Sequence, residues 1–256
     1  MSESLTVQIK PYERINDKEL AELISENLFH TQGVTPSMLV EGAIMKYGLL
    51  RIIIFLLLFF FLAFNTLAFS DLGTIAKIAV SVILEASVIF LLYGYIFPTK
   101  EMRRLKKEVP GMIAKELSDV KGKFMLPGSH FWLAMMKESE NSDAEKIVGC
   151  VLVEPYDAKK DYTSIMGDSD VSGEVAQLRR MSVDASIRRQ GIGGKLIAEV
   201  KKFCLQNGYK TLMLTTFPSN KVAISFYQKL GFVYKKKVLV NFFSYPLPVA
   251  VLVMKL

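Results

Sequence analysis

The segment Leu178-Arg-Arg-Met-Ser-Val-Asp184, separated by three residues from Arg188-Arg-Gln-Gly-Ile-Gly-Gly-Lys195, decides the fold of this chain. Its first part ends a β-rich run over 175–183, which predicts a strand. Its second part opens a run over 193–206 with apolar residues at helical spacing, which predicts a helix closed by Asn207-Gly208. A strand, a glycine-rich turn and a helix therefore follow one another.

The glycine-rich turn predicts a binding site for an anion. The first N–H groups of a helix have no intrahelical partner, and the helix dipole is positive at that end. Gly191, Gly193 and Gly194 would let a diphosphate approach the backbone closely, and Arg188 and Arg189 add positive charge. An ordinary capped helix would explain the glycines but not the placement of the arginines.

Other phosphate motifs fit this turn less well. A dinucleotide-binding fingerprint requires a third small residue where Leu196 stands, and an acidic residue about twenty positions further on. A P-loop requires Ser or Thr directly after the lysine, but Leu196 follows Lys195.

A second motif lies downstream on a predicted helix: Asn220-x-x-Ala223-x-x-x-Tyr227-x-x-x-Gly231-Phe232. Together with Arg188-x-x-Gly191-x-Gly193 and the strand–helix–strand–helix order, it resembles the GNAT N-acetyltransferase superfamily. Ser129-His-Phe-Trp-Leu-Ala134 and Arg180-Met-Ser-Val-Asp184 are similar to its membrane-bound, camello-like branch, over nearly the whole chain. That branch includes cysteine-S-conjugate N-acetyltransferases, aspartate N-acetyltransferase and protein-lysine acetyltransferases of the endoplasmic reticulum.

The resemblance implies an enzyme that transfers an acetyl group from acetyl-CoA to a primary amine, which attacks the thioester directly. The strands over 175–183 and 211–217 would splay apart, with the pantetheine arm in the gap. The acceptor stays open among a small amino acid, a cysteine S-conjugate and a protein lysine. The residues expected to contact acetyl-CoA are Met181, Ser182, Val183, Arg188, Arg189, Gln190, Gly191, Ile192, Gly193, Gly194, Lys195, Asn220 and Tyr227.

The chemistry of acetyl transfer gives individual residues candidate roles. A backbone N–H near 181–183, freed from pairing by the splay, would bind the oxyanion. The resemblance makes Tyr227 the proton donor to the departing thiolate, unless its ring only packs against the sheet. Glu174 is the candidate general base and Asp184 the second choice, although either could be a solvated carboxylate. Arg180 would bind a substrate carboxylate, a phosphate or only solvent.

Two apolar runs predict a transmembrane hairpin. Residues 52–69 contain only two polar residues, and residues 75–97 are nearly as apolar, broken by Lys77 and Glu85. A helix rises about 1.5 Å per residue, so the first run reaches roughly 27 Å, close to the hydrocarbon thickness of a bilayer. Buried core helices are the alternative, but these rarely stay apolar on all faces over such a length.

Basic residues flank the hairpin but do not occur in its loop, which predicts that both flanks are cytosolic. Glu85 would be protonated or face another helix, and homo-oligomer contacts through the hairpin are a further expectation. The resemblance alone indicates the endoplasmic reticulum, and a lumenal catalytic domain stays open. The flanking basic residues are Lys46, Arg51, Lys100, Arg103, Arg104, Lys106 and Lys107.

We expect an α/β (α+β) fold of the GNAT type, in which helices flank a mixed, mostly antiparallel sheet that splays in the middle. Residues 1–50 would supply the first strand and helix, residues 51–97 the inserted hairpin, and residues 98–256 the main domain with the acetyl-CoA site. A basic amphipathic helix over 99–120 would be bent or divided by Pro110, with its basic face on lipid headgroups or merely solvated. The stretch 157–173 is predicted to be a loop.

Composition excludes several other classes. The net charge of +7 is spread along the chain, which suits a membrane surface or a phosphate-rich cofactor but does not argue for nucleic acid. Two cysteines among apolar neighbours do not predict a disulfide framework, and two distant histidines do not predict a metal cluster.

Two readings from other functional classes remain. The first is a membrane scaffold that binds CoA without turnover, against which Tyr227, Gly191 and Gly193 argue. The second is a membrane channel or signalling hairpin with an incidental soluble domain, which only Glu85 supports.

Overall fold

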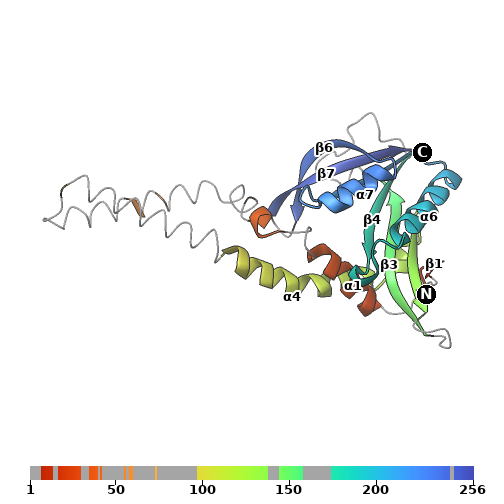
Figure 1. Cartoon of the computed structure of the whole chain (residues 1–256), viewed down its shortest axis with the longest axis horizontal. Helices are drawn as coiled ribbons and strands as arrows, with labels where there is room; N and C mark the ends of the chain where they lie inside the picture. Colours follow the sequence, from red (N-terminus) through yellow and green to blue (C-terminus); the bar gives the residue numbers. More distant parts are fainter. Residues whose placement is uncertain are drawn as a thin grey trace. The chain divides into compact units, whose positions relative to one another are not determined.

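The computed structural model describes residues 7–13, 17–29, 35–39, 41, 55, 58–59, 73, 97–137, 144–157, 174–242 and 245–256. The chain divides into two compact units. The larger comprises 1–34, 106–240 and 248–256, and the smaller comprises 35–105 and 241–247. All the candidate site residues lie in the larger unit, which Figure 1 colours along the sequence.

The described strands form one seven-stranded sheet in the order β1-β2-β3-β4-β5-β7-β6. Neighbours pair antiparallel from β1 to β4 and between β5 and β7, whereas β4 and β5 are parallel. The predicted mixed, mostly antiparallel sheet is therefore confirmed. The strands are β1 (Val7–Pro11), β2 (His130–Lys137), β3 (Glu145–Pro155), β4 (Val175–Val183), β5 (Thr211–Thr216), β6 (Val233–Phe242) and β7 (Tyr245–Lys255).

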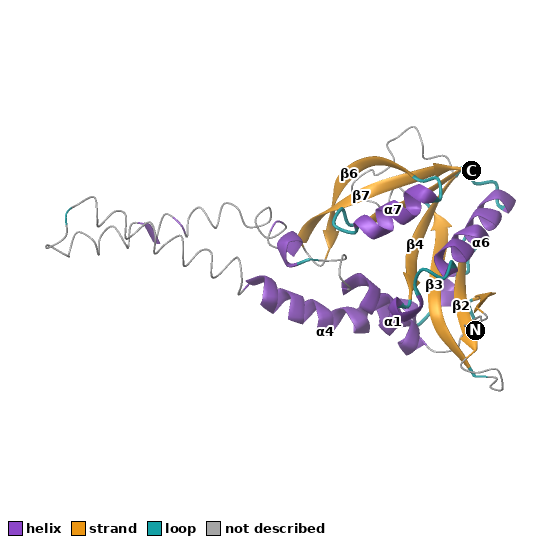
Figure 2. Cartoon of the chain, viewed as in Figure 1, coloured by secondary structure: helices purple, strands orange, loops and turns teal. Residues whose placement is uncertain are grey.

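Helices cover both faces of this sheet (Figure 2). Leu196, Ile197 and Val200 of α6 share a buried core with Tyr227 of α7 and with alternate residues of the central strands. α1 contacts β3 and β4 but adds no described residue to that core, so it covers the other face. The helices are α1 (Asp17–Phe29), α4 (Phe97–Leu117), α5 (Val120–Phe124), α6 (Ile192–Gln206) and α7 (Lys221–Lys229).

The periodicity of apolar residues explains why α6 forms where the sequence predicts it. Leu196, Ile197, Val200 and Cys204 are fully buried, at the three- and four-residue spacing of one helix face. Burying one such aliphatic side chain stabilises the fold by about 1.5–3 kcal/mol. The start of α6 is therefore fixed in place beside the end of β4.

α4 differs from its prediction. It runs without interruption through Pro110 and ends at Leu117, so the expectation that Pro110 divides the helix is wrong. Leu105, Val109 and Ile113 recur every four residues and are buried. This stripe anchors the helix although Pro110 cannot donate a backbone hydrogen bond.

The predicted hairpin over 51–97 lies almost entirely outside the described residues, as do Glu85 and most of the 157–173 loop. None of the helices in the described part of the chain is both long enough and apolar enough to cross a membrane.

Candidate active site

β4 and β5 pair over only part of their length. The parallel register runs from Val175 opposite Thr211 to Leu178 opposite Leu214. β4 continues to Val183 and β5 to Thr216, beyond the last pair. The carboxyl ends of the two strands therefore separate, and backbone groups of β4 beyond Leu178 have no partner on β5. This is the splay that the sequence predicts.

β4 carries a β-bulge where it leaves β5. Leu152 of β3 pairs with Arg179 and Cys150 pairs with Ser182, so β4 has one more residue than β3 between these pairs. Arg180 lies in the bulge with a φ of 53°. Holding a non-glycine residue in this left-handed conformation costs on the order of 1–3 kcal/mol, and such strained residues cluster at functional sites. A bulge also changes the direction in which its side chains point.

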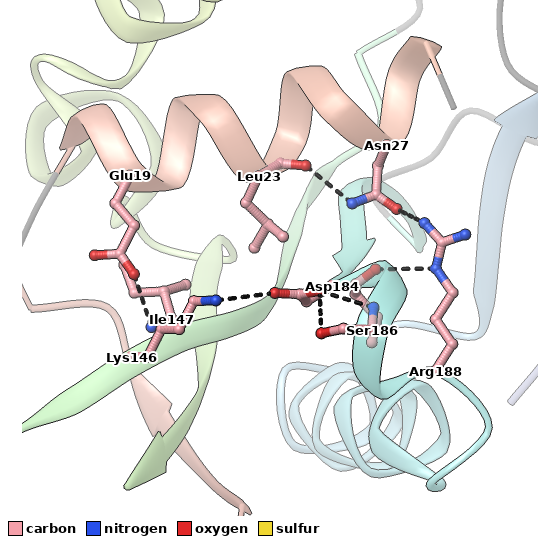
Figure 3. Close-up of polar contacts among 9 residues, drawn as sticks. Glu19, Leu23, Asn27, Lys146, Ile147, Asp184, Ser186 and Arg188 are labelled. Carbon is pink, nitrogen blue, oxygen red and sulfur yellow. Dashed lines mark hydrogen bonds and ion pairs between the residues drawn. The ribbon is translucent and has the colours of Figure 1, made fainter. Parts of the chain in front are cut away.

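Asp184 fixes the turn after β4 (Figure 3). Its Oδ1 accepts hydrogen bonds from the backbone N–H of Ser186, at 2.9 Å, and from the Ser186 hydroxyl, at 2.7 Å. Its Oδ2 pairs with the Lys146 ammonium at 3.3 Å. The bonds from Ser186, and then Lys146, lower the pKa of Asp184. This carboxylate is engaged in holding the turn.

The three glycines of this segment differ in their surroundings. Gly191 caps α6 with a φ of 79°, a conformation that favours glycine. A Cβ on Gly193 would lie 2.9 Å from the Phe226 ring, so this glycine lets α6 and α7 pack closely. A Cβ on Gly194 would meet nothing within 4 Å. The space beside Gly194, like that beside Gly191, is therefore open to a ligand at the helix start.

The start of α6 also presents backbone donors. The Lys195 N–H donates to the Gly191 carbonyl at 3.0 Å, the first hydrogen bond within the helix. The N–H groups of Ile192, Gly193 and Gly194 precede that bond and lie at the positive end of the helix dipole.

α7 holds Tyr227 on the same face of the sheet. Asn220 caps the helix by accepting a hydrogen bond from the Ala223 N–H at 3.1 Å. Tyr227 is only 7% exposed, and its ring contacts Phe226 and Phe232 edge-on. Burial raises the pKa of Tyr227, so its hydroxyl stays protonated at neutral pH. A protonated hydroxyl can act as an acid.

The profile of the Acetyltransferase (GNAT) family matches residues 97–232, more than half of the chain. The chain belongs to the GNAT acetyltransferase family. A GNAT-family acetyltransferase from Staphylococcus aureus Mu50 is similar in structure, with a TM-score of 0.50 and 14% identity over 98% of this chain and 99% of that chain. That similarity concerns the fold.

Two curated relatives share a shorter segment with this GNAT chain. N-acetylaspartate synthetase of Xenopus tropicalis is 31% identical over 118 residues, which cover 46% of this chain and 36% of that protein. Human N-acetyltransferase 8 is 33% identical over 121 residues, covering 47% and 46%. The chain therefore matches less than half the length of each of these relatives.

Glu174 does not lie at the splay between β4 and β5. It directly precedes β4, at the end of the strand that pairs with β5, and its carbonyl accepts a hydrogen bond from Thr211. Its carboxylate pairs with the exposed Lys210 ammonium at 2.5 Å. The splay lies at the opposite end of β4, so this position gives the predicted role as general base no support.

Arg188 also differs from its expected place. Its Nε donates to the Val183 carbonyl at 3.1 Å, and its Nη2 donates to Asn27 Oδ1 on α1 (Figure 3). The guanidinium thus fastens the turn to α1. Arg189, Gln190 and Lys195 are exposed beside the start of α6.

Arg180 has a partner that the sequence did not indicate. Its Nη2 donates to the Glu116 carboxylate on α4, while its Nε is buried and has no hydrogen-bond partner among the described residues. From the sequence, Glu116 is predicted only to be one residue of a basic amphipathic helix over 99–120. No spacing rule connects residues so far apart in sequence.

Proposed function

We propose that the chain is an N-acetyltransferase that takes an acetyl group from acetyl-CoA and gives it to a primary amine. The observation that carries this proposal is the separation of β4 from β5 beyond Leu178 and Leu214, followed by the glycine-rich start of α6. Membership of the GNAT family supports it.

The start of α6 fits the diphosphate of CoA. The N–H groups of Ile192, Gly193 and Gly194 would bind its oxygens, and the space beyond Gly194 is open. Arg189 and Lys195 would add charge. The backbone of Met181, Ser182 and Val183 would contact the pantetheine arm, together with the neighbouring Gln190 and Asn220, whereas Arg188 would act by holding the turn.

Acetyl transfer requires three events at the splay. The amine nitrogen forms a bond to the thioester carbon, whose oxygen becomes an anion. A backbone N–H near Met181 would bind that oxyanion, and one such preorganised donor contributes roughly 10²–10³ in rate. The C–S bond then breaks, and Tyr227 gives its proton to the departing thiolate.

The direct experiment is release of free thiol from acetyl-CoA in the presence of a panel of amino acids, cysteine conjugates and lysine peptides. The protein's own thiols interfere little, because burial raises the pKa of Cys150 and Cys204 to about 12. We expect amine-dependent thiol release and an acetylated product. CoA binding without turnover would instead indicate a scaffold, and this proposal would fail.

We extend the proposal to the membrane. The apolar runs over 52–69 and 75–97 and the basic residues around them support a membrane hairpin with the catalytic unit cytosolic. The assignment to the endoplasmic reticulum rests only on the resemblance to the camello-like branch. Protease treatment of sealed microsomes should remove a tag at the C-terminus. Protection of that tag would place the catalytic unit in the lumen.

Arg180→Met should raise KM for a carboxylate-bearing amine about tenfold more than for the same amine without its carboxylate. A guanidinium at the bulge suits a carboxylate, and a relative is named N-acetylaspartate synthetase, after an amine that carries carboxylates. Arg179→Met is the matched control, because Arg179 pairs with Glu154 at 2.7 Å on β3. Equal KM changes for both amines would reject this role.

A further inference from the structure

Consecutive residues of the β4 bulge reach opposite sides of the strand. A Cβ on Gly193 would lie 3.3 Å from Met181 Cε, so the Met181 side chain faces α6 and the glycine-rich turn. The Arg180 side chain instead reaches Glu116 on α4. The proposed CoA turn and the Arg180–Glu116 pair therefore approach the bulge from two different directions, as a donor and an acceptor must.

The Arg180–Glu116 pair differs from an ordinary surface ion pair. Its side chains are only 25% and 28% exposed, and the Arg180 Nε is buried without a partner among the described residues. A buried unpaired donor destabilises the folded state, and so does the left-handed backbone of the same residue. Two such costs on one residue indicate a site kept for function.

Acetyl transfer needs a group that removes a proton from the acceptor. A primary amine with a pKa of about 10 is almost entirely an ammonium ion at neutral pH. An ammonium ion has no free electron pair with which to attack the thioester. Glu174 lies at the opposite end of β4, and Asp184 holds the turn. Glu116 is the carboxylate that the structure ties to the residue preceding Met181.

We propose that Glu116 binds the substrate ammonium and takes its proton, and that Arg180 positions this carboxylate. The inference rests on the proposed acetyltransferase activity and assigns its missing base. One guanidinium nitrogen of Arg180 holds Glu116, while the buried Nε–H is directed to an acceptor oxygen of the substrate.

The ammonium gives one proton to Glu116, and the freed electron pair forms the C–N bond. The C–S bond breaks, and the thiolate receives the Tyr227 proton. The nitrogen then loses its second proton, which returns Tyr227 to its protonated form through water, and Glu116 releases its own proton to solvent. The products are the amide, CoA thiol and one proton.

The test is the pH dependence of kcat/KM for the best amine acceptor of the full chain. In the wild type the value should stay nearly flat from neutral pH to the pKa of the amine, since Glu116 removes the proton. Glu116→Gln should lower it about a thousandfold at pH 7, with a rise of about tenfold per pH unit as neutral amine becomes available. The difference should nearly vanish about three units higher, near the pKa of the amine.

Three measurements separate this role from a structural one. Calorimetry should give the same Kd for CoA in the wild type and in Glu116→Gln. Glu116→Asp, which keeps the carboxylate, should retain a flat profile with at least about a tenth of the wild-type kcat/KM. Glu154→Gln, which breaks the neighbouring Arg179 pair, should match the wild type.

An unchanged kcat/KM in Glu116→Gln, or an equal loss at every pH, would overturn the inference. If Glu116→Gln does not fold, a profile for Glu116→Asp that rises tenfold per pH unit would overturn it as well. A wild type that acetylates no amine would instead refute the proposed function, so the two failures are distinguishable.

Discussion

Tyr227→Phe should lower kcat by roughly 10³ and leave the Kd for CoA within about twofold of the wild type. The substitution removes only the hydroxyl, while the ring keeps its contacts with Phe226 and Phe232. Because burial keeps this hydroxyl protonated, it is available to the thiolate at neutral pH. Single-turnover kinetics and calorimetry measure the two quantities separately.

Tyr209→Phe is the matched control for this prediction. Tyr209 is also buried, and its hydroxyl donates to the Gly128 carbonyl at 2.8 Å; it lies just before β5, at the end of that strand away from the splay. Its loss should cost about 1 kcal/mol of folding free energy and leave kcat unchanged. Wild-type kcat in Tyr227→Phe would show that Tyr227 only packs against the sheet.

Gly194→Asp should weaken CoA binding by several hundredfold or more without lowering the melting temperature. The side chain meets no neighbour, since a Cβ there has nothing within 4 Å. An acidic residue in the first turn stabilises a helix by about 0.3–1 kcal/mol, and replacing glycine in a helix adds a similar amount. The same charge would repel a diphosphate about 5 Å away by a few kcal/mol.

Gly194→Asn isolates the charge in this experiment, because its side chain has the same shape as that of aspartate. We expect its Kd for CoA to stay within about tenfold of the wild type. Thermal melts and calorimetric titrations of the three proteins give both quantities. Equal affinities for the Asp and Asn variants would mean that no diphosphate lies at the start of α6.

The central strand and helix were predictable because local patterns determine them. The expected strand over 175–183 is β4, and the helix expected at 193–206 begins one residue earlier, at Ile192. Gly191 supplies the left-handed cap, and the apolar stripe of α6 has one face to bury. Both features are visible within a few residues of sequence.

Contacts between distant segments were not predictable in this way. Arg188 bonds to Asn27, and Arg180 to Glu116, only because the fold brings α1 and α4 to the end of β4. The sequence predicts a role for Glu174 because this residue stands at the start of the strand before the glycine-rich turn. A strand rises about 3.3 Å per residue, however, so Glu174 lies at the far end of β4 from the bulge.

The proposed acetyl transfer requires that the N–H groups at the start of α6 bind a diphosphate. Calorimetric titration of the full chain with CoA, and separately with pantetheine, tests this most directly, since pantetheine keeps the thiol arm but lacks the diphosphate. We expect saturable binding of CoA and at least a hundredfold weaker binding of pantetheine. Equal affinity for the two compounds, or no binding of CoA, would contradict the proposed function.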